Sequence, residues 1–403
     1  MLRDRLTINI IANAGASPLG TSGGDRIFIE CARGWVREGH KMRILVWKEG
    51  YEVCKKNKLE DVDYKVFKSE YKQFGFAFMY LARTIEGCVQ ALRIRPKENS
   101  EKTVIYSSSD FWPDSLPAFI MKKRVKNSKW VAGFYFFAPS PFKSSSDIEY
   151  RGGRAPFRLK NLAYHFSQRI VYRLIGRNAD FILVANELDK SIFVKDGVSP
   201  AKVIPVYGGV DIKAISQIPP PQVSKYDGCF VGRLHPQKGP LELVRIWGLV
   251  CKARPSAKLA LIGNGPSENE VKDEIRRRNL DHNIDMLGYV GSNEMYDVLK
   301  SSKVFLHTPV LDTGGMAAAE GMACGLPVVG FDLPGYHFCY PRGMLKAPIG
   351  DIEAFAALVL NLLQDEDLYY KARNEALEFA QQWDWDRKVR DILNSIESLF
   401  AEV

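Results

Sequence analysis

Two cations follow a short apolar run in the second half of the chain. In the segment CFVGRLHPQKG, Arg233 and Lys238 stand five residues apart, directly after a predicted buried strand. Such a pair suits a diphosphate, because a guanidinium forms forked hydrogen bonds to phosphate oxygens and an ammonium supplies a point charge. Two solvated surface residues would give the same pattern. The pair by itself therefore leaves a diphosphate site and an ordinary surface equally open.

Two acids flank a glycine-rich turn further along the chain. Asp312 and Glu320 are separated by seven residues in DTGGMAAAEG, and Gly314, Gly315 and Met316 between them open a predicted helix. Asp312 precedes this helix and Glu320 lies inside it, so both carboxylates can face a ligand over the helix N-terminus. A loop acid and a surface glutamate are the alternative.

Glycines follow two other predicted strands. Gly23 and Gly24 stand between the first strand and an amphipathic helix, where free backbone N–H groups and the helix dipole favour an anion. The segment has no GxGxxG and no following Lys-Ser or Lys-Thr, so a plain turn remains open. Gly263 ends another strand in LALIGNGP, where a missing side chain makes room for a ligand or for a helix.

These residues need parallel sheets to position them. Short β-rich runs alternate with longer helical patterns, which predicts parallel strands with helices on both faces. The turn-rich YGGVD and the IPPPQ at 218–222 predict a domain boundary within 207–226, and thus two doubly wound domains that share one cleft. The predicted strands are 7–12, 41–47, 103–107, 130–134, 181–185, 203–206, 228–231, 258–262, 284–287, 304–307 and 327–330.

The charge of the chain is divided between its two halves. The net charge of +9 comes from 56 Lys and Arg against 47 Asp and Glu. Residues 1–205 hold 35 basic and 21 acidic side chains, whereas the rest of the chain holds 21 and 26. The sum leaves nucleic acid, a membrane surface and an acidic ligand open, but the partition assigns the excess to the first half.

Several classes of protein are disfavoured by what the sequence lacks. The seven cysteines are odd in number and nowhere spaced as CxxC, so neither a disulfide framework nor a thiolate zinc site is expected. The apolar run after the N-terminus is shorter than a signal core, and no stretch reaches the ~18 apolar residues of a membrane span. We therefore expect a cytoplasmic protein that meets a membrane, if at all, on its surface.

Together, in this order, these segments resemble the retaining GT-B glycosyltransferases of family four. The most specific part is GR followed by KG, then an acid, seven residues, Glu and GMACGLPVVG. The resemblance implies two Rossmann-like domains facing one cleft: an acceptor-side domain at 1–206, a nucleotide-sugar-binding domain at 207–382, and a C-terminal helix at 383–403 that returns to the first domain. It implies transfer of a hexose from a UDP- or GDP-sugar to a lipid-linked or polysaccharide acceptor, with retention of configuration.

The same resemblance implies roles for individual residues. Gly23 and Gly24 would approach the donor diphosphate, and Arg233 and Lys238 would neutralise it as it departs, so that no metal or other cofactor is needed. Glu320 would bind the ribose. The rest of the implied donor site consists of Asp312, which with the amides of Gly315 and Met316 would hold the sugar, together with Gly263 and Gly314.

The sequence departs from the family pattern in three places. Asp312 stands where Glu is usual, and YHFCY at 336–340 lacks a common acid. The segment WVAGFYFFAPSPF offers Tyr135 and its two following phenylalanines where many members have a His close to the sugar. Either Asp110 or Asp114 takes that catalytic role, or the protein is a catalytically silent nucleotide-sugar-binding subunit or scaffold.

A basic segment in the first half indicates a possible partner. Residues 151–177 carry seven basic side chains and no acid, which is typical either of a solvated face or of contact with anionic lipid on the inner face of the cell membrane. The basic residues expected to join such a contact are Lys122, Lys123, Arg124, Lys126 and Lys129. No nucleic-acid recognition module is apparent, and the oligomeric state is not predicted. The residues expected at the membrane or acceptor are Arg151, Arg154, Arg158, Lys160 and Arg169.

Overall fold

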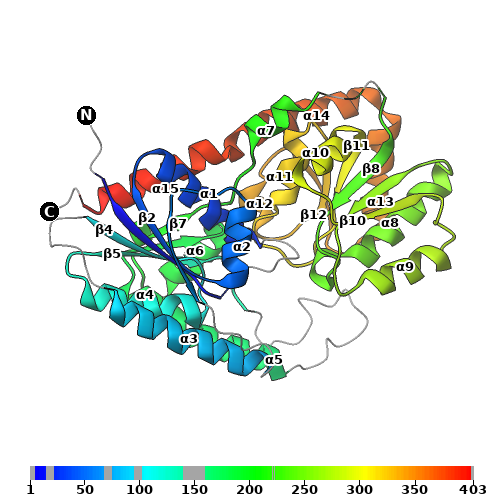
Figure 1. The fold of residues 1–403 in the computed structure, drawn as a ribbon. Coiled ribbons are helices and arrows are strands. Elements are labelled where there is room, and N and C mark those ends of the chain that lie inside the picture. Colours follow the sequence, from blue (N-terminus) through cyan, green and yellow to red (C-terminus); the bar gives the residue numbers. More distant parts are fainter. Residues whose placement is uncertain are drawn as a thin grey trace. The chain divides into compact units, whose positions relative to one another are not determined.

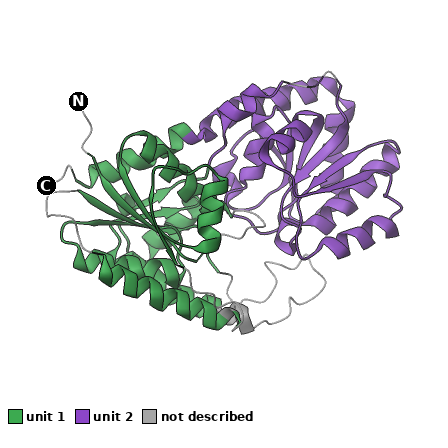
Figure 2. Cartoon of the chain, in the orientation of Figure 1, with its two compact units in different colours: residues 1–147, 153–208, 386–403 green, residues 148–152, 209–385 purple. Residues whose placement is uncertain are grey.

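The computed structural model divides into two compact units, which are shown in Figure 2. Unit 1 comprises Met1–Asp147, Gly153–Gly208 and Asp386–Val403, and unit 2 comprises Ile148–Gly152 and Gly209–Trp385. The structure describes residues 5–14, 22–67, 75–94, 102–138, 159–219, 221 and 223–400. No helix in these ranges combines the length and the apolar character that a membrane span requires.

Unit 1 is built on a seven-stranded sheet with the order β3-β2-β1-β4-β5-β6-β7, and every neighbouring pair is parallel. Helices lie on both faces of the sheet (Figure 1). The strands are β1 (Thr7–Ala12), β2 (Lys41–Trp47), β3 (Asp63–Phe67), β4 (Thr103–Ser107), β5 (Lys129–Phe134), β6 (Phe181–Val184) and β7 (Val203–Pro205). The helices are α1 (Gly23–Arg37), α2 (Lys48–Lys56), α3 (Phe76–Arg93), α4 (Trp112–Arg124), α5 (Leu159–Asn178) and α6 (Glu187–Lys195).

The last helix, α15 (Trp385–Ser398), packs on unit 1 from Asp386 onward. The indole Nε1 of Trp35 in α1 donates to the carbonyl of Val389 at 3.3 Å, and Arg37 pairs with Asp386 at 3.0 Å. A Cβ atom on Gly34 would collide with the Val389 side chain, so only a glycine lets the two helices approach this closely. The predicted return of the C-terminal helix is confirmed.

Unit 2 is built on a six-stranded parallel sheet with the order β10-β9-β8-β11-β12-β13. Its strands are β8 (Tyr226–Val231), β9 (Leu259–Ile262), β10 (Ile284–Gly288), β11 (Ser302–His307), β12 (Val328–Phe331) and β13 (Met344–Ala347). Its helices are α7 (Ile212–Gln217), α8 (Pro240–Ala253), α9 (Glu268–Arg277), α10 (Ser292–Lys300), α11 (Met316–Ala323), α12 (Tyr336–Cys339), α13 (Ile352–Gln364) and α14 (Glu366–Ala380). Two doubly wound parallel sheets confirm the predicted fold class.

The chain passes between the units at Gly208 and again at Trp385, two and three residues away from the predicted boundaries at 206 and 382. Val210 forms a parallel bridge with Asp384, and the Trp385 indole packs over Gly209, where any Cβ would overlap it. These contacts keep both crossing segments with unit 2. A backbone bridge of this kind leaves no mark in local sequence.

All eleven predicted strands are present, but β3 and β13 were not predicted. Both are outermost strands of their sheets. β3 alternates exposed and half-buried residues and reads DYKVF, and β13 has four residues. An edge strand buries less apolar surface than a central one, so its sequence carries a weaker signal.

Candidate active site

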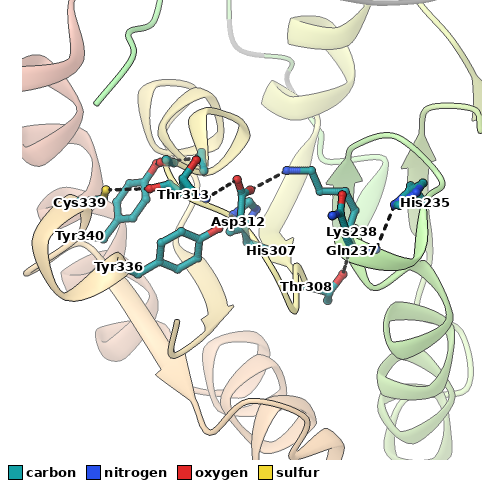
Figure 3. Close-up of polar contacts among 12 residues, drawn as sticks. His235, Gln237, Lys238, His307, Thr308, Asp312, Thr313, Tyr336, Cys339 and Tyr340 are labelled. Carbon is teal, nitrogen blue, oxygen red and sulfur yellow. Dashed lines mark hydrogen bonds and ion pairs between the residues drawn. The ribbon is translucent and has the colours of Figure 1, made fainter. Parts of the chain in front are cut away.

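In unit 2 the direction of the strand order reverses between β8 and β11, which lie side by side in the sheet. The loops after two such strands diverge to opposite faces, and ligands of doubly wound sheets bind at this point outside the carboxyl ends. Here the two loops are joined by hydrogen bonds (Figure 3). The Thr308 hydroxyl donates to the carbonyls of Lys238 at 3.0 Å and Gly239 at 3.1 Å, and the Val310 N–H donates to the carbonyl of Gln237 at 2.9 Å.

Across this junction Lys238 and Asp312 form an ion pair, with Nζ 2.6 Å from Oδ2. Burial alone would raise the pKa of Asp312, but the Lys238 charge opposes burial and, with the N–H of Thr313, brings the pKa down to about 2. The side chain of Lys238 remains 34% exposed, whereas that of Asp312 is 13% exposed. Asp312 is therefore ionised and mostly buried, and its partner Lys238 is still reached by solvent.

His307, the last residue of β11, lies beneath Asp312 and was not singled out by sequence. Its Nε2 is 2.7 Å from the hydroxyl of Tyr336, and both side chains are buried. Burial lowers the pKa of His307 to about 3, against the opposing attraction of Asp312, so the imidazole is neutral near pH 7. The signal that could have found it is a polar residue at the end of an apolar strand, next to the Asp312 loop.

The turn between Asp312 and α11 fits only glycine at one position. Gly315 precedes the first residue of α11, Met316, with φ +65°, and a Cβ there would lie 3.0 Å from His307 Nε2 and 3.1 Å from the Tyr336 hydroxyl. The hydroxyl of Tyr340 donates to the carbonyls of Gly315 at 2.7 Å and Gly314 at 3.3 Å. Two tyrosines of the YHFCY segment thus hold the turn, and they occupy the place where the resemblance led us to expect an acid.

A model of the family described as glycosyl transferases group 1 matches residues 211–382, almost the whole of unit 2. Residues 211–382 of unit 2 carry the sequence pattern of a glycosyl transferases group 1 domain. The junction of Lys238 and Asp312 therefore lies in the part of the chain that carries the family resemblance, and the sequence interpretation of that part is confirmed at the level of the family.

Relatives and solved structures agree with this assignment. The chain is 25% identical over 266 residues to an uncharacterized glycosyltransferase of Methanocaldococcus jannaschii, covering 55% of this chain and 64% of that protein. It is 23% identical over 173 residues to the GPI3 subunit of a Saccharomyces cerevisiae phosphatidylinositol N-acetylglucosaminyltransferase, covering 42% and 38%. The alignments thus span less than two thirds of either relative.

The whole fold resembles the crystal structure of Anabaena HepE in complex with UDP and glucose. The TM-score is 0.70 at 16% identity, and the match covers 98% of this chain and 100% of that one. At this identity the likeness establishes the fold, which is that of the GT-B glycosyltransferases.

The remaining predicted residues of the group 1 domain lie in different surroundings. Arg233 is exposed in the loop after β8, and among the described residues no side chain pairs with its guanidinium. Glu320 lies inside α11 and is 4% exposed. The structure therefore brings Lys238, Asp312 and the Gly315 turn together, whereas Arg233 stands free in solvent and Glu320 is covered by protein.

Gly263 has a structural explanation that needs no ligand. It has φ +135°, and a Cβ there would overlap the backbone carbonyl of Gly232. Gly265 approaches the backbone of Leu234 in the same way. The two glycines let the loops after β8 and β9 pack backbone against backbone, so the room that Gly263 makes is filled by the neighbouring loop.

In unit 1, α1 begins at Gly23 behind a capping box. The Ser22 hydroxyl accepts from the Asp25 N–H at 3.2 Å, and the Ser22 N–H donates to the Asp25 carboxylate at 2.9 Å. A Cβ on Gly24 would lie 3.1 Å from the Tyr135 ring. Gly24 is therefore next to the residue that replaces the expected His, and the Tyr135 hydroxyl is itself bonded to that of Tyr106 at 2.8 Å.

The two candidate acids of unit 1 are not equivalent. Asp114 accepts from the Asn13 and Ala14 N–H groups and from the Ser108 and Ser109 hydroxyls, and it is fully buried. Burial nevertheless raises its pKa to about 7. Because all four partners belong to the loops after β1 and β4, Asp114 joins these loops and has no acceptor left for a substrate.

Within the described ranges Asp110 has one side-chain hydrogen-bond partner, Gln168 of α5, whose Nε2 donates to it at 2.7 Å. Gln168 also bonds the Phe136 carbonyl and the Ala138 N–H, so Asp110 is tied to the segment that lacks the His. Burial raises the pKa of Asp110 to about 6. Of the two predicted acids, Asp110 is the one placed to act beside that segment.

The structure describes only some of the residues predicted to lie at the membrane or acceptor. Arg169 is exposed on α5, as are Arg173 and Arg177. The residues at 151–158 and the side chain of Lys160 lie outside the described part of the chain, so that prediction remains open for Arg151, Arg154 and Arg158. No group of three or more His, Cys, Asp or Glu within the described ranges has the arrangement of a metal site.

Proposed function

We propose that the protein transfers a hexose from a UDP- or GDP-sugar to a lipid-linked or polysaccharide acceptor, with retention of configuration and without a metal. The observation that carries the proposal is the Lys238–Asp312 pair at the strand-order reversal of a glycosyl transferases group 1 domain. The HepE structure contains UDP and glucose, and the yeast relative is named for transfer to phosphatidylinositol, which supports a nucleotide sugar and a lipid-linked acceptor.

In this proposal Lys238 changes partner. The Lys238 side chain is 34% exposed and bonded to Asp312, so an incoming diphosphate can bind the ammonium with little desolvation. Asp312, once released, is an ionised acceptor for sugar hydroxyls beside the amides of Gly315 and Met316. Arg233 closes on the diphosphate from solvent, because no side chain in the described part of the chain has to be displaced from it first.

The proposed reaction breaks the bond between the anomeric carbon and the diphosphate oxygen. The acceptor hydroxyl attacks from the face that the diphosphate leaves, and its proton passes to the departing phosphate oxygen. Lys238 and Arg233 stabilise the charge that develops on this leaving group, in a role that a divalent metal fills in other transferases. Glu320 remains the proposed ribose ligand, and Gly23, Gly24 and Asp110 remain the proposed contributions of unit 1.

Slow hydrolysis of the donor by the purified protein tests this function. We expect release of UDP or GDP from one member of a panel of nucleotide sugars, unchanged by EDTA and abolished by Lys238→Ala and by Glu320→Ala. Lys303→Ala is the matched control, because Lys303 also pairs with an acid of unit 2, Asp227, at 2.9 Å. Hydrolysis that survives Lys238→Ala would contradict the proposed roles.

A second function is favoured by the surroundings of Tyr135. Its hydroxyl is bonded to Tyr106, and Asp114 is occupied by four donors, so neither replaces the expected His. We propose as the alternative a nucleotide-sugar-binding subunit or scaffold without catalysis. Binding of a donor, detected by thermal shift, without hydrolysis or transfer to any acceptor would decide for it.

A further inference from the structure

The outward face of α3 is apolar from Ala77 to Leu92. Every strongly exposed residue of this helix between Ala77 and Leu92 is apolar. The large ones recur at intervals of three and four residues, which places them in one stripe. They are Phe78 at 49% exposure, Leu81 at 49%, Ile85 at 63%, Val89 at 36% and Leu92 at 52%.

The inward face of the same helix carries the polar and small residues. Tyr80 accepts from the Trp112 N–H at 2.9 Å, Arg83 reaches Glu49 at 3.4 Å, and Thr84 is buried. A Cβ on Gly87 would lie 2.9 Å from Pro117 of α4, so the two helices are in close contact there. The helix is thus held by its polar side, which is the reverse of the usual surface helix.

Cations lie next to this stripe at the carboxyl end of α3. Arg124, at the end of α4, donates to the carbonyls of Ala91 at 2.8 Å and Ile94 at 3.4 Å, which places it beside the last turn. Arg93 and Lys123 are also exposed. In the described parts of α4, α5 and the loop between α4 and β5, the one acid is Asp114, and it is buried.

The amino end of α3 leads to a second exposed apolar pair on α5. Tyr80 contacts the Phe111 ring edge to face at 6.3 Å, and Phe111 stacks on Tyr164 of α5 at 5.3 Å. Two and six residues further along α5, Phe166 and Ile170 are 49% and 58% exposed, and Arg169 and Arg173 beside them are exposed. Both α3 and α5 pack on α4 at one border of unit 1 (Figure 1).

We propose that the α3 stripe (Phe78, Leu81, Ile85, Val89 and Leu92), with Phe166 and Ile170, binds the surface of an anionic lipid bilayer. An exposed apolar patch of this extent marks an interaction site. A helix with an apolar outer face and neighbouring cations lies in the plane of a bilayer, with its side chains among the acyl chains and the cations at the head groups. The charge of the surroundings selects anionic lipid over a neutral protein partner.

This proposal does not depend on the chemistry of unit 2, so it is tested without donor or acceptor. The full chain is sedimented with vesicles of phosphatidylcholine and phosphatidylglycerol, and with vesicles of phosphatidylcholine alone. We expect binding to the mixed vesicles that weakens with salt. Leu81→Glu and Ile85→Glu should each lower it about tenfold or more, because each removes one apolar side chain from the bilayer.

Ile349→Glu is the matched control, because Ile349 is 42% exposed in unit 2 and belongs to neither the stripe nor the proposed site. It should leave binding within about twofold, as expected of an exposed side chain outside the contact. Arg169→Glu together with Arg173→Glu should lower binding to the mixed vesicles and leave the phosphatidylcholine arm unchanged. Equal binding of Ile85→Glu and the control would overturn the proposal.

A gain-of-signal variant covers the case in which a glutamate disturbs folding. We expect the fluorescence of Ile85→Trp to be quenched by brominated lipids, and that of Ile349→Trp not to be. Absence of quenching at position 85 would overturn the proposal. So would a native dimer, seen by analytical ultracentrifugation, that Ile85→Glu dissociates, because the stripe would then be an interface between two copies of the chain.

Discussion

The two units carry the same arrangement of parallel strands but use the acids at their strand-order reversals in opposite ways. In unit 2, Asp312 is ionised under Lys238, with a pKa near 2. In unit 1, Asp114 is surrounded by neutral donors and its pKa is near 7. A cation can be drawn away by a ligand, whereas four hydrogen bonds to adjacent loops hold those loops in place. In the proposed function, the Lys238–Asp312 junction exchanges partners with a ligand, whereas the Asp114 junction holds its loops in place.

The largest expected effect comes from the substitution that removes the Lys238–Asp312 ion pair. Lys238→Ala should reduce donor hydrolysis or transfer by roughly two to three orders of magnitude, as removal of a group that stabilises developing charge does. Asp312, left buried without its cation, should also regain a higher pKa. Steady-state kinetics on the purified variant measure the loss, with Lys303→Ala as control. A loss of less than about tenfold would show that the pair is not the centre of the site.

The second prediction concerns the pH dependence of stability. The contribution of the buried acid should change with pH in opposite directions in the two units. Asp312 has a lowered pKa in the folded state, so it contributes stability at neutral pH that is lost as pH falls from about 4 towards 2. Asp114 and Asp110 have raised pKa values of about 7 and about 6, so the stability tied to their protonated forms is lost as pH rises from about 4 through those values.

Neutral variants separate these contributions. The stability advantage of the native protein over Asp312→Asn should be largest at neutral pH, and its advantage over Asp114→Asn should be largest near pH 4. Denaturant unfolding across this pH range, with hydrogen exchange to follow each unit, measures both. If the stability difference between native protein and variant changed with pH in the same direction for both variants, the contrast between the junctions would be contradicted.

The third prediction tests the turn that holds Asp312. Gly315→Ala should destabilise unit 2 by about 1 to 3 kcal/mol, because a β-carbon is strained at positive φ and meets His307 and Tyr336. Gly291→Ala is the control, since nothing lies within 4 Å of a Cβ there and its φ is not positive. Thermal unfolding compares the two. Equal stability of both variants would show that the turn adjusts freely.

The smallest expected effect on stability comes from Arg233. Arg233→Ala should change the free energy of unfolding by less than about 0.5 kcal/mol, because the guanidinium is exposed and bonded to no described side chain. It should nevertheless weaken donor binding about tenfold, the loss expected for one charge-assisted hydrogen bond. Calorimetric titration with the donor measures this. Unchanged affinity would remove Arg233 from the proposed site.

Sequence predicted the group 1 domain better than unit 1 for a physical reason. Arg233 and Lys238 lie in one short segment, and Asp312 and the glycine turn lie in another, so spacing along the chain reports placement within each segment. The Lys238–Asp312 pair joins the two segments across 74 positions. Two of the four partners of Asp114, the N–H groups of Asn13 and Ala14, come from residues about a hundred positions away, and no local pattern records such a contact. The same reason hid the contact of His307 with Tyr336, which are 29 residues apart.

Gly263 shows the limit of reading a glycine as a ligand contact. The sequence allowed a ligand or a packed element, and the structure places the Gly232 backbone there. The α3 stripe shows a different limit. Its periodicity is that of an ordinary helix, and sequence does not tell which face is buried until α4 is seen to cover the polar side.

Hydrogen–deuterium exchange with a panel of UDP- and GDP-sugars tests the central claim most directly. The account predicts that one donor protects the backbone at 232–239 and 308–316 in the native protein, and that this protection disappears in Lys238→Ala but persists in Lys303→Ala. Protection confined to other segments, or none at 232–239 and 308–316 with a donor that the protein demonstrably turns over, would contradict it.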